Sequence, residues 1–176
     1  MDKIYKTEFH RTFLIEALPA PLTRASRHLQ LFDNYIANTR MRLLSIRDPQ
    51  TKGWTYILQQ RSPAVGEDIS ALKIADIYLN EAEHDRFKLF EDNEIRKNRY
   101  FHEFDRVPFE FDVFLGNLWG LNMARIGFEN AESLNDFEPP PSAVLEVSKN
   151  PFFYGDNLVS KKFVDVQAEV MKSGSG

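Results

Sequence analysis

Most of this chain consists of runs of residues that alternate in character with a period of two, and this period is typical of β-strands. The helical segments between the runs are few and short. Many consecutive strands predict an antiparallel sheet in an α+β fold, and closing or strongly curving that sheet would remove its exposed edges. The expected strands are Lys6–Ile15, His28–Ile36, Thr39–Arg47, Trp54–Arg61, Ala71–Leu79, Glu94–Phe104, Pro108–Leu115, Leu121–Glu129 and Val144–Val147.

Turn formers and helix caps mark the boundaries between these runs. Asp48–Gly53 and Asp105–Val107 predict hairpins, and Ser62–Asp68 reads as a polar loop. Asn80 is followed three positions later by Glu83, which is the signature of a helix start. Helices are therefore expected at about Asn80–Asp92, Asn130–Phe137 and Phe152–Phe163.

The size and composition of the chain suit one soluble domain. With 176 residues, 43% of them hydrophobic, the chain can bury a sizeable core. We expect one domain over residues 1–172, with the Ser-Gly-Ser-Gly end at 173–176 as a flexible tail or a cloning remnant. The absence of cysteine fits a reducing compartment, and the absence of a long apolar run predicts a cytoplasmic protein without a membrane partner. A net charge of -4 argues against nucleic acid as a partner.

Pairs of like charges stand two residues apart on several of the expected strands. Residues at i and i+2 of a strand share one face, roughly 7 Å apart. The pairs are Arg40 with Arg42, Lys97 with Arg99, and Glu110 with Asp112, while Glu8 shares a face with His10.

Two interpretations of these pairs remain open. Each pair can simply be the solvated outer face of an amphipathic strand. Alternatively, the pairs face inward, where like charges are stabilised only by opposite charges or by a ligand. Basic pairs inside a barrel would bind a polyanion, and the acidic pair would hold a hard divalent cation, which together meet the electrostatic needs of phosphoryl chemistry. No P-loop pattern is present.

Taken in order along the chain, these residues resemble the CYTH (triphosphate tunnel) family. The resemblance covers about residues 4 to 163, and its most specific parts are Lys97-Asn98-Arg99-Tyr100 and Glu110-Phe111-Asp112-Val113-Phe114. It implies an eight-stranded antiparallel barrel, closed or nearly closed, with short flanking helices. Basic side chains in this tunnel would bind a triphosphate, and acidic side chains would hold Mg²⁺ or Mn²⁺.

The resemblance also implies roles for particular residues. The substrate-binding residues would be Arg40, Arg42, Lys97, Arg99 and Lys161. The catalytic residues, which would also be the metal ligands, are Glu8, Glu110 and Asp112.

The opening motif departs from the family pattern. The family has Glu-x-Glu-x-Lys, whereas this chain has Glu8, His10 and Thr12 at the corresponding positions. His10 can ligate a transition metal, act as a base near neutral pH, or be a plain structural histidine.

Two later positions also depart from the pattern. The lysine that follows the arginine strand in the family falls on Gln60 or Arg61, depending on the register. A later Glu-x-Glu pair reads Arg125 and Gly127, which places a positive charge where the family has an acid.

The leading hypothesis is a divalent-metal-dependent hydrolase of inorganic, nucleoside or thiamine triphosphate. The alternative is a catalytically degenerate module that binds a nucleotide or polyphosphate without turnover, and the missing acids favour it. A cyclase follows only from family analogy. A scaffold that binds a partner through Trp54, Trp119 or the aromatic cluster at 152–154 is a further option.

Overall fold

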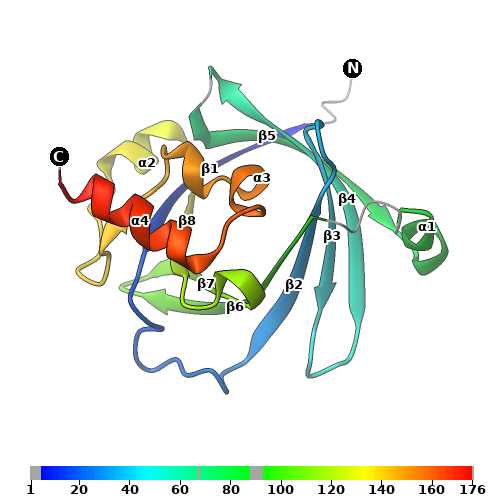
Figure 1. The fold of residues 1–176 in the computed structure, drawn as a ribbon, viewed down its shortest axis with the longest axis horizontal. Helices are drawn as coiled ribbons and strands as arrows, with labels where there is room; N and C mark the ends of the chain where they lie inside the picture. The colour runs from blue at the N-terminus through cyan, green and yellow to red at the C-terminus, as the bar shows by residue number, and fades with distance from the viewer. Residues whose placement is uncertain (1–4, 67, 88–92, 176) are drawn as a thin grey trace.

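The strands of this protein form a closed antiparallel barrel (Figure 1). The computed structural model describes residues 5–66, 68–87 and 93–175. Eight strands are neighbours in the order β5-β4-β3-β2-β6-β7-β8-β1, and β1 pairs with β5 to close the ring. The eight-stranded α+β barrel expected from the sequence is therefore confirmed. The strands are β1 Lys6–Leu14, β2 His28–Tyr35, β3 Met41–Arg47, β4 Trp54–Val65, β5 Asp68–Leu79, β6 Glu94–Phe104, β7 Val107–Phe114 and β8 Asn122–Phe128, with a short β9 Leu145–Glu146 paired to β1 outside the ring.

The prediction of a polar loop at Ser62–Asp68 is wrong, because the two flanking strands extend into this segment. β4 continues to Val65 and β5 begins at Asp68. A register irregularity between Pro63 and Val65 accommodates the proline, which cannot donate a hydrogen bond to the ladder. Gly66, with a φ of 57°, lies at the turn between the two strands.

The two helix starts predicted from asparagine caps are confirmed. Asn80 accepts a hydrogen bond from the Glu83 backbone amide and begins α1 (Glu81–Arg86). Asn130 caps α2 (Ala131–Asp136) in the same way. α1 ends at Arg86, earlier than expected, and residues 88–92 of the predicted helix lie outside the described residues.

The C-terminal region is more helical than the sequence analysis predicted. The expected helix at 152–163 is divided into η3 (Pro151–Phe153) and α3 (Gly155–Leu158). α4 (Phe163–Ser173) then follows, and it includes the first residue of the expected tail. Phe163 and Val166 recur at helical spacing on its buried side. The sequence analysis did not use this signal, because it ended the last expected helix at Phe163. A further short turn, η2, covers Gly116–Leu118.

Three clusters of buried apolar residues pack this barrel, and the smallest consists of Leu31, Leu44 and Ile57 on β2, β3 and β4. On the outer face of β1, β6, β7 and β8, large side chains such as Phe13 and Phe111 are covered by residues near Leu18, Leu22 and Phe137. At one end of the ring, inward-facing apolar residues of β6, β7 and β8 pack against η3, α3 and α4, which lie across this part of the barrel in Figure 1. No helix in the described part of the chain is both long and apolar enough to cross a membrane.

Candidate functional site

The barrel holds a cavity of about 610 Å³, here called the interior cavity, whose wall combines charged and apolar side chains. Alternate residues of the strands face it, as the period of two requires. α3 and η3 cover one side, where Phe153, Tyr154 and Leu158 contribute to the lining. The charged residues in its wall are Glu8, Asp33, Arg40, Arg42, Arg61, Lys97, Arg99, Glu110, Asp112, Arg125 and Asp156.

A first group of charges centres on two buried aspartates. Arg42 Nη1 donates to Asp33 Oδ2 at 2.9 Å, and Arg42 Nε donates to Gln59 at 2.8 Å. Lys97 Nζ lies between the two acids, 2.8 Å from Asp112 Oδ2 and 3.8 Å from Asp33 Oδ2. Strands β2, β3, β6 and β7 thus bring two acids and two basic side chains together in the interior.

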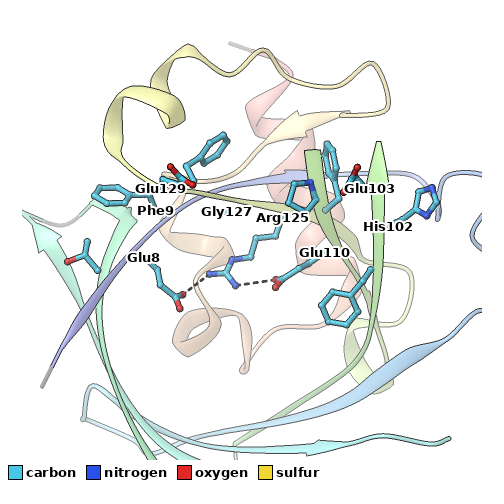
Figure 2. A pocket seen from close by; sticks show the side chains of 13 residues that line it. Glu8, Phe9, His102, Glu103, Glu110, Arg125, Gly127 and Glu129 are labelled. Carbon is cyan, nitrogen blue, oxygen red and sulfur yellow. Dashed lines mark hydrogen bonds and ion pairs between the residues drawn. The ribbon is translucent and has the colours of Figure 1, made fainter. Parts of the chain in front are cut away.

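A second group continues the chain of charges toward β1. Arg99 forms a bidentate pair with Asp112, at 2.7 and 2.8 Å, and its Nη1 lies 3.1 Å from Glu110 Oε2. Arg125 spans from Glu110 Oε2, at 3.3 Å, to Glu8 Oε2, at 3.4 Å. In Figure 2 the side chains of Glu8, Arg125 and Glu110 point toward one another.

The pKa values of the buried acids and bases follow from these contacts. Burial alone would raise the pKa of Asp112, but the charges of Arg99 and Lys97 outweigh it and hold this pKa well below its usual range. Burial likewise opposes the charges of Arg42 and Lys97 at Asp33, and the pKa of Asp33 is again lowered. Both aspartates are therefore ionised at neutral pH, and each neutralises cations that face the interior.

Arg61 and the exposed Arg40 differ from the other cations of the cavity wall, because no carboxylate of the described residues forms an ion pair with either of them. The guanidinium carbon of Arg61 lies 5.8 Å from the centre of the Tyr35 ring. Burial, and then repulsion by Arg42, lower the pKa of Arg61 from its ordinary value. The pairing of Met41 with Gln60 and of Arg42 with Gln59 also fixes the register: Arg61 lines the cavity, while Gln60 bonds Tyr5 in an exposed contact.

Most of the residues that the sequence analysis selected line the interior cavity. Glu8, Glu110, Asp112, Arg42, Lys97 and Arg99 do so with largely buried side chains, and Arg40 does so with an exposed one. Lys161 is not among the described lining residues, and its Nζ lies 5.7 Å from the centre of the Phe152 ring. His10 is buried and also lines the cavity.

Sequence reasoning missed Asp33 and the position of Arg125 between two acids. Asp33 is the most buried of the interior acids, with a side chain 1% exposed. Its signal was present, since it stands among Leu31, Phe32 and Tyr35, with Asn34 as the only other polar residue of that stretch. A lone acid in such a run indicates either a buried ion pair or an error of register, and the pattern alone does not name the partner.

Solved structures share this barrel. A structure described as the hypothetical protein NE1496 superposes with a TM-score of 0.60 at 19% identity, covering 88% of this chain and 99% of its own. A second, described as the inorganic triphosphatase NE1496, gives 0.59 at 20% identity, covering 86% and 93%. This chain has a CYTH-like fold. No protein-family model and no curated protein matches its sequence.

The carboxylates of this CYTH-like barrel do not fit a metal site as they stand. Among the described residues, no three histidine or acidic side chains come close enough together to hold a metal ion. Both oxygens of Asp112 accept from Lys97 and Arg99, and Glu8 lies between Lys6, at 2.7 Å, and Arg125. Oxygens that already accept from cationic side chains are not free to ligate Mg²⁺ or Mn²⁺.

Proposed function

We propose that the CYTH-like barrel binds a triphosphate group, inorganic or carried by an organic molecule, in the interior cavity. The observation that carries this proposal is Arg61, a partly buried guanidinium that faces the cavity and has no carboxylate partner among the described residues. A cation held partly out of water without a counter-ion is costly, and an anionic ligand would remove that cost.

The remaining walls of the cavity support the same ligand. Arg42, Lys97, Arg99 and Arg125 come from three different strands, β3, β6 and β8, so their donors surround the cavity instead of forming one flat patch. Arginine donates pairs of parallel hydrogen bonds that match the geometry of phosphate oxygens. The volume of about 610 Å³ lies within the range of small-ligand sites, roughly 300–1,000 Å³.

The acids have a defined part in this proposal. In the free protein Asp33, Asp112, Glu110 and Glu8 neutralise the cations and so keep a highly charged cavity stable. Phosphate oxygens would share these donors, and each arginine has enough N–H groups to serve a carboxylate and a phosphate together.

Tripolyphosphate binding tests the proposal. We expect tripolyphosphate to raise the thermal unfolding temperature, because a ligand that binds only the folded state stabilises it by mass action. Replacing Arg61 with glutamine is expected to weaken binding about 10- to 100-fold, since hydrogen bonds to charged groups contribute about 1.5–3 kcal/mol. Isothermal titration calorimetry measures this loss.

The control is Arg96→Gln, on the same barrel. Arg96 is an exposed residue of β6 that pairs with Glu94 and does not line the cavity. Its replacement is expected to leave the affinity unchanged. Equal affinities for the wild type and Arg61→Gln, with both proteins folded, would reject the interior cavity as the binding site.

Hydrolysis of the bound triphosphate is the second candidate function. The similarity to the inorganic triphosphatase NE1496 and the presence of Glu8, Glu110 and Asp112 in one cavity favour it. In that case these three acids are the proposed catalytic residues, and phosphate release should depend on added Mg²⁺ or Mn²⁺.

Phosphate release from tripolyphosphate, ATP and thiamine triphosphate is to be measured for the wild type and for a Glu110→Gln, Asp112→Asn double variant. Equal release by both would exclude this role for the two acids, and binding without release leaves the protein as a module that binds triphosphate without turnover.

A further inference from the structure

One guanidinium lies between two carboxylates at the boundary of the interior cavity. Arg125 is on β8, and the neighbouring strands β7 and β1 contribute Glu110 and Glu8. Nη1 of Arg125 lies 3.3 Å from Glu110 and Nη2 lies 3.4 Å from Glu8, so its two terminal nitrogens serve different acids (Figure 2). The same three residues also line a second hollow of about 860 Å³ on the other side of the bridge, so the guanidinium lies where the two spaces adjoin.

The arrangement gives Arg125 the electrostatic position of a bound cation. A divalent ion between Glu8 and Glu110 would need their oxygens to converge to roughly 2.0–2.6 Å from one centre. Here the guanidinium occupies that position, while Lys6 and Arg99 approach the same two acids from their other sides. Glu8 and Glu110, the two carboxylates that the described residues bring to this place, therefore already have side-chain cations as partners.

The sequence of β8 explains why a guanidinium lies at the place of a divalent ion. Where the resemblance leads one to expect two acids, the strand has Arg125 and Gly127. Gly127 adds no side chain to the wall, and Arg125 adds a positive charge in place of a negative one. Arginine stays protonated at any physiological pH, so this charge is permanent and needs no metal.

We propose that Arg125 supplies, from within the chain, the positive charge that a divalent metal would otherwise supply, so that triphosphate binds in this barrel without metal. This inference rests on the proposed function and adds to it the identity of the counter-cation. Arg125 is about one quarter exposed, which leaves N–H groups accessible from the cavity for a phosphate oxygen. Magnesium or manganese is then unnecessary for binding.

Titration of tripolyphosphate with and without metal tests this inference. For the wild type we expect affinities in EDTA and in Mg²⁺ that agree within about threefold at equal free tripolyphosphate. Replacing Arg125 with glutamine should weaken binding in EDTA by at least about tenfold, because it removes one charged donor. The matched control is again Arg96→Gln, an exposed arginine on the outside of the barrel, whose affinity should not change in either buffer.

A charge-reversal variant, Arg125→Glu, provides a readout that does not involve triphosphate. It would place a third acid between Glu8 and Glu110, so Mn²⁺ alone should raise its unfolding temperature, whereas Mn²⁺ should leave that of the wild type unchanged. If this variant does not fold, the comparison of the wild type with Arg125→Gln decides the question. Wild-type binding that requires Mg²⁺ overturns the inference and leaves the proposed function intact. Full metal-free affinity in a folded Arg125→Gln variant also overturns it, and no wild-type binding in either buffer rejects the proposed function itself.

Discussion

At the scale of single residues, the charges of the interior cavity depend on their neighbours for stability. Asp112 is 5% exposed and accepts hydrogen bonds from both Lys97 and Arg99. A buried ion pair gains little over well-packed apolar residues, but removing one partner leaves an uncompensated buried charge. The acids therefore allow several cations to be held close together before any ligand is bound.

Replacing Asp112 with asparagine tests whether this acid stabilises the folded protein by neutralising its cationic neighbours. We expect the free energy of unfolding at pH 7 to fall by about 3–5 kcal/mol, because Lys97 and Arg99 lose their shared counter-charge. The pKa of Asp112 is lowered in the folded state, so its stabilisation is present above the unfolded pKa of about 4 and is lost as the pH falls below it. Urea unfolding should show the gap between wild type and variant narrowing between pH 7 and pH 3, and a constant gap would contradict this assignment.

At the scale of elements, α3 meets the barrel wall through one unusually close approach. A Cβ atom at Gly155 would lie 1.8 Å from the Tyr35 hydroxyl, so only glycine fits there. Tyr35 itself lines the cavity beside Arg61, and α3 covers that side. The position of the short helix is thus coupled to the wall that holds the proposed ligand.

Replacing Gly155 with alanine is expected to destabilise the fold by about 1–3 kcal/mol, the usual cost of overpacking. It should also weaken tripolyphosphate binding, because Tyr35 or α3 must move. Gly174→Ala is the control, since an added Cβ there would meet no atom closer than 3.7 Å. Unfolding curves and calorimetry of the two variants provide the comparison, and equal stability would show that α3 does not depend on this contact.

The sequence predicted the elements better than it predicted their contacts. Alternation located the eight barrel strands because a strand with one buried face must alternate, and the two asparagine caps located α1 and α2. The register was not predictable in the same way: whether Gln60 or Arg61 faces inward depends on pairing with β3, which involves residues distant in sequence. The bridge formed by Arg125 was unpredictable for the same reason, because its two acids come from β7 and β1.

At the scale of the whole molecule, the sign of the charge differs between the chain and its cavity. The chain carries a net charge of -4, whereas the lining holds six lysine and arginine residues and five acids. The cations come from several strands around the ring, so a longer anion reaches more of them. Whole-chain charge therefore does not indicate the ligand, and the interior distribution does.

Affinity should consequently rise with the length of the phosphate chain. We expect phosphate to bind weakly, pyrophosphate more tightly and tripolyphosphate most tightly, because each added phosphoryl group reaches donors from a further strand. Competition calorimetry with the three anions measures this order. Equal affinities for all three anions would indicate a single local anion site, and would contradict binding by donors from several strands at once.

The most direct measurement is a crystal structure of the protein grown with tripolyphosphate. The account predicts the anion inside the barrel, with its oxygens within hydrogen-bond distance of Arg61 and Arg42 and no metal needed beside Arg125. An anion bound only on the outer surface, with Arg61 still lacking an anionic partner, would contradict it.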